Sequence, residues 1–552
     1  MKQYKYILIS ALVLLGFTSC EDFLDRPTED SYTIDSFYQT NEQCYQAANT
    51  LYNSPWYDFQ RGFISVGERL SGNIYSGNNP YVSFTLNGTD EDLVNMSASL
   101  WSVNAYCNSV VENINTKAGP AVSDEVKKAV KGEALTWKAM AYFYLVRIWG
   151  AVPIIHNNTD EIAKGKYNQI KKATVENVYD YIIMTLEQAI EWLPETAAAG
   201  RIDRYSAYGL LSKVYLTKSG LGKTSQDPDD LAKAAEYALK VIEESGRQLE
   251  PNYSDIFRLA KNTGDESLIA WRWVTSIVWT SQNTLQSDLA IEGFSEFADT
   301  WGGWTGPTVD LQDAFGENAL STDRQNRDSR RKATMMMYGD KYEYFWADKG
   351  GFDVADHYMN TLGAWQCGTG ANCVKHLVGN ENDHLTGIGH AMDRMATSLA
   401  THILRLSDVY LVYAEAALKS NPELAVKYFN MIRSRAGVPE LSTITWEDVW
   451  KERRLELACE GDRWYDYVRW HYFEPQKAIN ELKNQRRSTY TGLDSFYESG
   501  SLDPSSTYYD RQPTTINVND SHFELPFPDT DKLMNPNLML DPEDIDISQF
   551  TY

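Results

Sequence analysis

Tryptophan and tyrosine side chains gather in two segments of the chain that are rich in Asn, Asp and Gly. Sugars present flat patches of C–H bonds beside rings of hydroxyl groups, so proteins bind them with exposed aromatic faces bordered by hydrogen-bonding side chains. The first segment, residues 73–81, supplies Tyr75 and Tyr81, with Arg69 just before it. In the second segment the aromatic and polar candidates are Trp279, Trp301, Trp304, Trp346 and Trp365, interspersed with Gln282, Asn283, Arg324, Asn326 and Asp348. The composition predicts a carbohydrate ligand, with Tyr75, Tyr81, Trp279, Trp301, Trp304 and Trp346 as contacts.

The alternative for each of these rings is a place in the hydrophobic core, where a single tryptophan is more often found. Glycines separate Trp301 from Trp304, and a glycine-rich loop rarely organises a buried indole, so both interpretations stay open for these two residues. Trp271 and Trp273 lie two positions apart in a predicted strand at 266–275. Since alternate residues of a strand face the same side, at least one of them should belong to the core.

Three carboxylates near the C-terminus could also do chemistry, because Glu452, Glu456 and Glu460 recur at four-residue steps. Two carboxyls across a sugar would make a glycosidase pair, but like charges on one helical face repel unless cations approach them. The cations at close sequence range are Arg453, Arg463, Arg433 and Arg435. We therefore favour a buried Glu–Arg network that pins the last helices, and predict no catalytic residue.

No other motif points to catalysis or to a bound cofactor. The eight histidines contain no HExxH pattern, CxxC spacing is missing, and neither a GxSxG turn nor a dinucleotide fingerprint occurs. The sequence predicts no metal site, no cofactor and no enzyme activity.

The net charge excludes a general nucleic-acid partner. The 552 residues include 51 Lys and Arg against 76 Asp and Glu, a formal charge of −25, whereas binding to phosphate polyanions needs a surplus of cations. Hydrophobic residues make up 43% of the chain, which is ordinary for a globular protein with a packed core.

The first twenty residues predict export and lipid anchoring. Lys2 and Lys5 precede an apolar run at 7–17, which is too short to span a bilayer and is typical of a secretory signal. Phe17-Thr18-Ser19-Cys20 resembles a bacterial lipoprotein box, in which the cysteine becomes the lipidated first residue of the mature chain. We expect residues 1–19 to be a signal peptide and Cys20 the lipid anchor; an ordinary signal peptide without lipidation is the alternative.

Five further cysteines remain for an oxidising compartment, an odd number, so at least one should stay unpaired. Cys367 and Cys373 flank the flexible sequence Gly-Thr-Gly-Ala-Asn. A local disulfide between them is the pairing we would test first.

The elements that position these residues are predominantly helices. Helix-rich composition and three- and four-residue apolar steps predict helices at 124–149, 174–193, 204–220, 229–245, 407–420 and 423–437. An Ala/Tyr/Leu-rich helix followed by a second amphipathic helix indicates stacked hairpins of the tetratricopeptide kind. Between residues 250 and 395 this pattern fades, which predicts a loop-rich region with little strand, packed on the helical scaffold.

Several segments resemble the SusD/RagB family of outer-membrane glycan-binding lipoproteins. CEDFLDRPTEDSY at 20–32 looks like the anchored start of the family, and AYFYLVRIWGAVPII at 141–155 resembles its first long helix. WKERRLELACEGDRWYDYVRW at 450–470 resembles the C-terminal helix signature, followed by a similar ending at 525–538. The sequence departs from the family after Leu538.

The resemblance implies an N-terminal SusD-like helical region at 20–250 and a C-terminal SusD/RagB region at 251–552. It implies a cell-surface lipoprotein on the outer membrane that captures oligosaccharide or polysaccharide for nutrient uptake. The implied partner is a SusC-like TonB-dependent barrel, over which the lipoprotein would sit as a lid. Glu21 and Asp22, directly after the anchor, resemble the surface-export signal of such lipoproteins.

Two rival functions stay open. A helical-repeat surface could bind a peptide, in which case a concave helical face rather than the loop tryptophans would carry binding. A surface glycoside hydrolase would release reducing sugar and would depend on one Glu or Asp.

Overall fold

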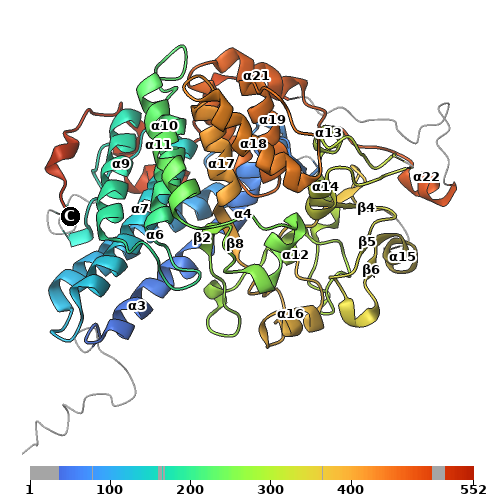
Figure 1. The fold of residues 1–552 in the computed structure, drawn as a ribbon, viewed down its shortest axis with the longest axis horizontal. Coiled ribbons are helices and arrows are strands. Elements are labelled where there is room, and N and C mark those ends of the chain that lie inside the picture. The colour runs from blue at the N-terminus through green and yellow to red at the C-terminus, as the bar shows by residue number, and fades with distance from the viewer. Residues whose placement is uncertain are drawn as a thin grey trace, which may run out of the picture.

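The computed structural model describes residues 37–77, 79–159, 165, 168–321, 323–362, 365–499 and 516–552. The predicted signal peptide, Cys20, Glu21 and Asp22 lie outside this range. In the described chain the fold is predominantly helical, as expected, with a helical scaffold on one side and a loop-rich region on the other (Figure 1).

The scaffold consists of long helices that pack side by side as antiparallel neighbours. Its first half contains α3 (Asn41–Asn49), α6 (Glu91–Lys117), α7 (Asp124–Trp149), α9 (Val175–Trp192), α10 (Arg204–Lys218) and α11 (Pro228–Glu244). Its second half contains α17 (Leu406–Ala416), α18 (Pro422–Ala436), α19 (Trp446–Leu457), α20 (Arg463–His471) and α21 (Pro475–Asn484). All six predicted helices are confirmed, with ends that differ by a few residues, and α11 packs on α17 to join the two halves.

Local capping explains why these helices begin and end where they do. The hydroxyl of Ser123 accepts a hydrogen bond from the backbone N–H of Val126 and so caps the start of α7, and Gly150 caps its end. α18 has Pro422 in its first turn, and the glycine that caps its end, Gly437, has a φ of 78°, in the left-handed region that favours glycine. These signals are local in sequence, and this is why the helices were predictable.

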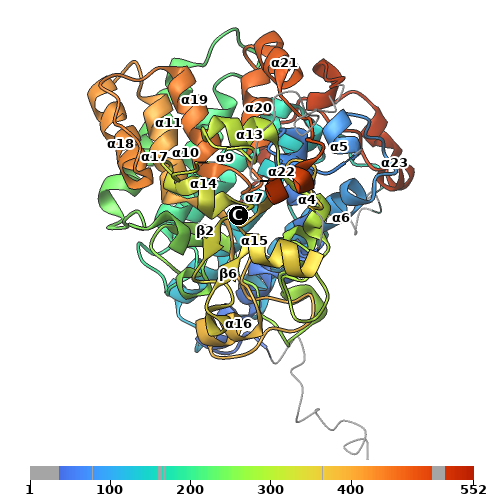
Figure 2. The ribbon, with the colours of Figure 1, turned by 90° about the vertical axis from the view of Figure 1, so that its right-hand side faces the viewer.

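The loop-rich region contains short elements between the two halves of the scaffold. Its helices are α12 (Leu285–Leu289), α13 (Val309–Ala314), α14 (Ser329–Thr334), α15 (Val354–His357) and α16 (Glu381–Ile388), and its strands are β2 (Ser267–Trp271), β3 (Gly306–Pro307), β4 (Met335–Met337), β5 (Lys341–Tyr342), β6 (Phe352–Asp353), β7 (Ala371–Cys373) and β8 (Thr401–Arg405). A further strand, β1 (Ile74–Tyr75), precedes this region in sequence. Four antiparallel two-stranded sheets form in the described chain, β1–β3, β2–β8, β4–β7 and β5–β6. Figure 2 shows this region turned toward the viewer, with α15 and α16 in front of the long helices.

The main hydrophobic core draws residues from both predicted regions, 20–250 and 251–552. Trp271 and Trp273 are 0% and 3% exposed, so the core interpretation is confirmed for both. A second apolar cluster lies wholly in the loop-rich part and the segment before residue 500. The boundary near residue 250 stays a prediction.

The three glutamates of the C-terminal signature are buried in an ionic network, as expected. Glu452 pairs with Arg433 and Arg330, Glu456 with Arg330, Arg405 and Arg435, and Glu460 with Arg405 and Lys375. Arg433 and Arg435 were predicted as partners. Arg453 and Arg463 were predicted wrongly, because their guanidinium groups turn instead to a separate set of carboxylates, Asp408, Asp462, Asp466 and Glu481.

The network joins parts of the chain that are far apart in sequence. Arg330 comes from α14, Lys375 follows β7, and Arg405 ends β8, so the loop-rich region is tied to α19 through its cations. Glu460 lies beyond the end of α19 at Leu457, so the three glutamates do not share one helical face as the spacing suggested.

The predicted disulfide is absent. Cys367 and Cys373 are both buried free thiols, and the same holds for Cys44, Cys107 and Cys459. The two thiols have other neighbours: Cys367 Sγ lies 3.2 Å from Thr369 Oγ1, and the Cys373 thiol hydrogen-bonds with that of Cys459. Burial raises the pKa of the Cys367 thiol to about 11, which keeps it protonated and unreactive at neutral pH.

The burial of Glu456 predicts a large loss of stability when its charge is removed. Burial alone would raise the pKa of Glu456, but the guanidinium groups of Arg435, Arg405 and Arg330 outweigh it and hold that pKa well below its usual range. Glu456→Gln leaves three buried cations short of a partner and should lower the free energy of unfolding by about 3–5 kcal/mol. Urea denaturation followed by far-UV circular dichroism measures the loss.

The matched control is Glu447→Gln, an exposed position on the same helix, which should change stability by less than about 0.5 kcal/mol. Because the folded pKa of Glu456 is depressed, its contribution is fully present above the unfolded value of 4.5 and declines as the pH falls below it. Equal stability of the two variants at pH 7 would contradict this account.

Candidate functional site

Two chain segments more than two hundred residues apart meet to form the candidate site. One contains α4 (Phe59–Ile64) and the π-helical turn η4 (Ser65–Leu70), and the other contains α12 and the 3₁₀ turn η8 (Gly302–Trp304). The amide of Gln60 holds them together: its nitrogen donates to the carbonyl of Gln282, and its oxygen accepts from the N–H of Thr284 at 3.2 Å.

Trp301 and Trp304 lie on the outside of the η8 turn. Trp301 is 45% exposed and Trp304 is 68% exposed, so the solvent-exposed interpretation is the one the structure shows for both rings. The backbone N–H of Trp301 donates to the carbonyl of Ser287, and its indole Nε1 donates to Asp288 Oδ1 at 3.1 Å. Gly302 lies so close to the backbone of Leu289 that a side chain would not fit, and this close approach keeps the turn on α12 with both indoles outward.

Trp279 is the third exposed indole, at 56%. It begins the short turn η7 (Trp279–Ser281), which is closed by a 2.7 Å hydrogen bond from the N–H of Val274 to the carbonyl of Ser281. Its ring meets that of Tyr57 edge to face, with centroids 6.4 Å apart. We refer to Trp279, Trp301 and Trp304 together as the aromatic platform.

Charged side chains line a pocket beside Trp301. Arg61 Nε lies 3.5 Å from Asp288 Oδ2. Burial raises the pKa of Tyr57, whose ring contacts Trp279, and the charges of Arg61 and Asp288 also affect this pKa. The pocket has a volume of about 320 Å³. Its polar and aromatic lining consists of Arg61, Arg69, Asp92, Asp288, Trp301 and Thr305. We call it the charged pocket.

A buried glutamate anchors the turn that carries Arg69. Glu68 Oε1 accepts from the N–H of Gly461 at 2.7 Å, and Oε2 accepts from the N–H of Cys459 at 3.0 Å and from Asn73 Nδ2 at 2.8 Å. Burial raises the pKa of Glu68 to about 7, although these donors oppose the shift. The π-helical turn is thus attached to the loop after α19, next to the ionic network.

The remaining predicted contacts lie elsewhere or face inward. Tyr81 is 1% exposed and its hydroxyl donates to Asp90 Oδ1 at 2.5 Å, so it presents no ring face to a ligand. Tyr75 is half-buried in β1 (Ile74–Tyr75), and the pairing of this strand with Gly306 and Pro307 places it beside the segment that follows Trp304. Trp346 is half-buried in the second apolar cluster, where Nε1 donates to the carbonyl of Phe294 at 3.0 Å and Lys349 Nζ lies 4.7 Å from the ring centroid.

Comparison with known proteins identifies the family of the chain. A family model described as "SusD family" matches residues 280–539, and one described as "Starch-binding associating with outer membrane" matches residues 22–216. A SusD-like protein from Bacteroides ovatus is 33% identical over 554 residues, which cover 96% of each chain. The chain belongs to the SusD family.

Solved structures agree with this assignment. A crystal structure determined with xylogluco-oligosaccharide is 31% identical, has a TM-score of 0.79, and is matched over 91% of this SusD-family chain and 99% of that one. A SusD-like carbohydrate-binding protein from Bacteroides fragilis is 21% identical and has a TM-score of 0.69. The match covers 91% of this chain and 100% of that one, and it shows the fold alone.

Among the described residues, the helices are too short or too polar to span a membrane.

Tyr57, Arg61 and Asp288 of this SusD-family site are not among the residues predicted from the sequence. A signal for two of them was present, because Tyr57, Arg61, Ser65 and Arg69 recur at four-residue steps, the spacing of one helical face. No helix had been expected there. Asp288 has no comparable signal in the sequence, because its contacts with Trp301 and Arg61 form only when the fold brings α12 against α4.

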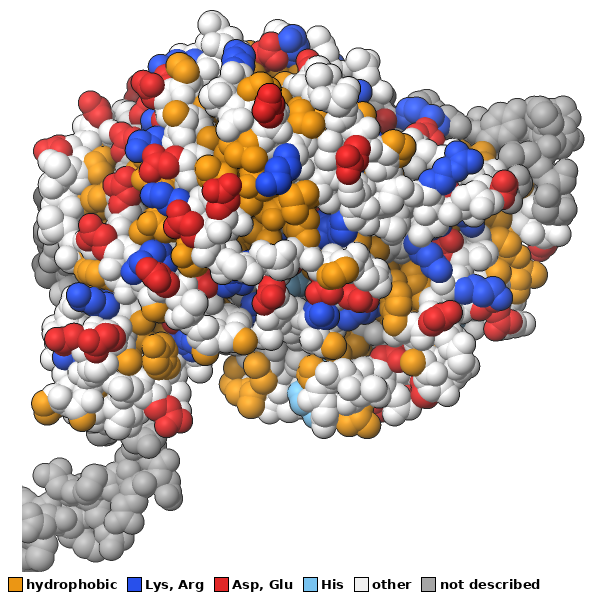
Figure 3. All heavy atoms as spheres, in the orientation of Figure 1, with side chains coloured by type: hydrophobic (Ala, Val, Ile, Leu, Met, Phe, Trp, Pro, Cys, Tyr) orange, Lys and Arg blue, Asp and Glu red, His pale blue; other side chains and the backbone are white. Residues whose placement is uncertain are grey.

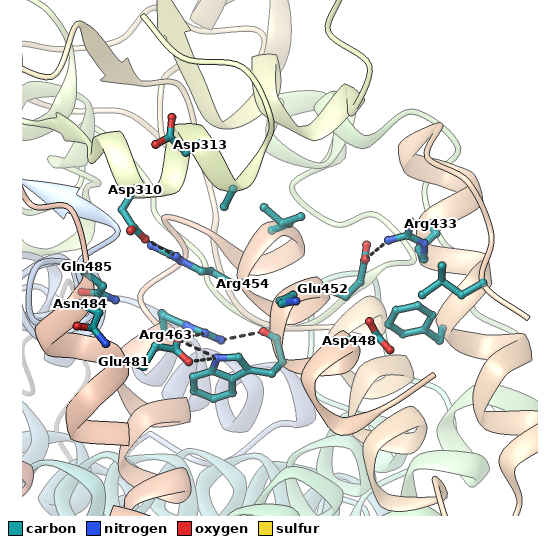
Figure 4. Close-up of a pocket in the computed structure, with 16 residues that line it drawn as sticks. Asp310, Asp313, Arg433, Asp448, Glu452, Arg454, Arg463, Glu481, Asn484 and Gln485 are labelled. Carbon is teal, nitrogen blue, oxygen red and sulfur yellow. Dashed lines mark hydrogen bonds and ion pairs between the residues drawn. The ribbon is translucent and has the colours of Figure 1, made fainter. Parts of the chain in front are cut away.

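A second cavity lies elsewhere, between α13 and the C-terminal helices, and has a volume of about 610 Å³ (Figure 4). Its charged groups turn toward one another: Arg454 Nη1 pairs with Asp310 at 2.7 Å, and Arg433 Nη1 pairs with Glu452 at 2.6 Å. Trp450 is 4% exposed, and the Arg463 guanidinium carbon lies 3.6 Å from its ring centroid. This cavity offers no free ring face, so the platform is the better carbohydrate site.

The exposure of the platform predicts that its tryptophans contribute little to folding. Trp304→Ala should change the free energy of unfolding by less than about 1 kcal/mol, because its exposed ring makes no hydrogen bond with the described residues. Trp279→Ala, which removes the contact with Tyr57, and Trp301→Ala, which removes the hydrogen bond to Asp288, should each cost about 1–2 kcal/mol. Trp271→Ala, in the core, should cost about 3–5 kcal/mol. Chemical denaturation monitored by circular dichroism compares the four variants, and a large loss at Trp304 would show that the ring packs inward in solution.

Proposed function

We propose that this SusD-family chain captures an oligosaccharide or polysaccharide at the cell surface without transforming it. The observation that carries the proposal is the aromatic platform: three indoles are 45–68% exposed on two anchored turns, and charged hydrogen-bonding groups line the pocket beside Trp301. Exposed rings at fixed positions stack on sugar faces at low entropic cost, because binding does not have to order them.

The identity of the first glycan to test comes from the relatives. The 31% identical structure matched over 91% of this chain was determined with xylogluco-oligosaccharide, and a further SusD-like structure, 21% identical, is described as laminarin-binding. Both ligands are neutral glucans. We therefore propose a neutral glucan, with xylogluco-oligosaccharide as the first candidate.

The proposed partner is a SusC-like TonB-dependent barrel in the outer membrane, to which the captured glycan would pass. The likeness to the family and the match of residues 22–216 to proteins described as associating with the outer membrane support this location. A lipidated Cys20 would hold the mature chain at the membrane, facing outward.

Catalysis is disfavoured by the environment of the conspicuous carboxylates. Glu452, Glu456 and Glu460 are buried and paired with cations, so they cannot reach a sugar. Next to the platform, Asp288 is engaged by Trp301 and Arg61, and Asp92 accepts from Ser65. A hydrolase would release reducing sugar from a glycan panel and would lose this activity in Asp288→Asn or Asp92→Asn; we expect no release by the unaltered protein.

A peptide-binding role would use a different surface. Figure 3 shows charged side chains of both signs interspersed over α9 to α11, and hydrophobic side chains gathered nearer the centre of this face, over α17 and α18. Met431 of α18 is 38% exposed and offers a control position on the helical scaffold.

The platform predicts a large loss of glycan affinity on removal of its rings. Trp301→Ala and Trp304→Ala should each weaken binding of xylogluco-oligosaccharide about tenfold or more, the effect of losing a ring that anchors an interface. Isothermal titration calorimetry and affinity electrophoresis on the mature chain with Cys20→Ala measure the change. Met431→Ala should leave binding within about twofold, and the opposite pattern would favour the helical surface.

Anchoring is tested separately in cells. Wild-type protein should take up labelled fatty acid and sediment with membranes, whereas Cys20→Ala should do neither. An unlabelled wild-type protein that is cleaved before residue 20 would instead indicate an ordinary signal peptide.

A further inference from the structure

The charged pocket shares a wall with the aromatic platform. Trp301 contributes to both, because its indole Nε1 donates to Asp288 on the pocket side while the ring itself is 45% exposed. A glycan chain that lies on the platform therefore passes the mouth of the pocket.

Arg69 enters the pocket with unused hydrogen-bond donors. Its Nη1 donates to Ser65 Oγ at 2.7 Å, and Ser65 Oγ donates in turn to Asp92 Oδ2 at 2.6 Å. Among the described residues the Arg69 side chain makes no other hydrogen bond, and its buried Nε has no partner. A guanidinium group desolvated in this way, with its pKa lowered by burial, is costly unless a ligand or solvent fills the open donor positions.

Asp288 supplies the complementary acceptor. Its Oδ1 accepts from Trp301, whereas Oδ2 lies 3.5 Å from Arg61 Nε and accepts no hydrogen bond from the described residues. Burial raises the pKa of Asp288, and Arg61 opposes this shift. Thr305 adds a hydroxyl that already bonds with Ser76 Oγ at 2.9 Å.

The pocket is balanced in charge and limited in size. Two guanidinium groups, from Arg61 and Arg69, stand against two carboxylates, from Asp92 and Asp288. An anionic sugar would bring its charge next to both carboxylates, whereas a neutral ring offers hydroxyl groups that both accept from guanidinium and donate to carboxylate. A volume of about 320 Å³ lies at the lower end of the range for ligand pockets, about 300–1,000 Å³, and suits a single ring better than a chain.

We propose that the charged pocket holds one neutral sugar ring that branches from, or ends, the glycan chain lying on the aromatic platform. Arg69 and Asp288 bind the hydroxyl groups of this ring, and they determine a preference for branched over unbranched glucans. The inference rests on the proposed function, since the platform must first hold the main chain.

The experiment compares two ligands with the same backbone. Xylogluco-oligosaccharide carries single-sugar branches, and a cello-oligosaccharide of equal backbone length carries none. Calorimetry on the mature chain with Cys20→Ala should show the branched ligand binding about tenfold tighter or more, as expected for charge-assisted hydrogen bonds made to the branch alone.

Pocket variants should remove this preference. Arg69→Lys, Arg69→Gln and Asp288→Asn should each lower the ratio of branched to unbranched affinity about tenfold. Asp288→Asn keeps an oxygen to accept from Trp301, so the platform retains its orientation. Asp356→Asn, an exposed position on α15, is the matched control and should leave the ratio unchanged. Thermal unfolding midpoints of all variants show whether the fold is kept, and Arg69→Lys preserves the charge if Arg69→Gln does not fold.

Specific outcomes would overturn the inference. One is equal affinity of the unaltered protein for the branched and the unbranched ligand. Another is an equal loss of affinity for both ligands in Asp288→Asn, which would mean that Asp288 only orients Trp301. Tighter binding of the same backbone with a glucuronic acid branch would refute the argument from charge balance. If Trp301→Ala and Trp304→Ala abolish binding while the pocket variants keep the ratio, this inference fails alone; if those tryptophan variants bind normally, the proposed function fails.

Discussion

The buried ionic network around α19 is the constraint on which the arrangement of the structure depends. Glu452, Glu456 and Glu460 lie inside the protein, where an unpaired carboxylate is costly. Their partners come from α14, the segment after β7, β8 and α18, so the charges are satisfied only when the loop-rich region and the C-terminal helices are assembled together. Such a network adds little stability compared with apolar packing. Any arrangement that leaves one of these buried charges without a partner is strongly destabilised, and for this reason the irregular loops stay attached to the helical scaffold.

The candidate site depends on that assembly through one further contact. Glu68 accepts hydrogen bonds from the backbone directly after α19, and the same turn carries Arg69 into the charged pocket. The tryptophans are held from the other side, where Trp301 bonds to α12 and Gln60 joins α4 to the segment before α12. The rings are exposed but their backbones are fixed, which suits recognition by stacking because little order has to be created on binding.

The sequence predicted the helices well and the individual contacts poorly, for physical reasons. α7 and α18 have caps and apolar periodicity within their own residues, so their bounds follow from local rules. Local rules do not predict the partners of Glu456. Arg435 is near it in sequence, but Arg330 and Arg405 belong to distant segments of the chain. The same limitation explains the disulfide predicted between Cys367 and Cys373, since a short flexible spacing allows closure without requiring it.

The amino-acid sequence by itself determined the helical scaffold, the likeness to the SusD family and the aromatic character of the proposed ligand surface. Tertiary structure alone decided which aromatic rings face outward: Trp301 and Trp304 do, whereas Tyr81 and Trp271, equally aromatic and also followed by polar or irregular segments, are enclosed. Helix formation depends on neighbours three or four residues away, whereas the exposure of a ring depends on what packs against it from elsewhere in the chain. Arg61, Arg69 and Asp288 likewise became one pocket only when α4 met α12.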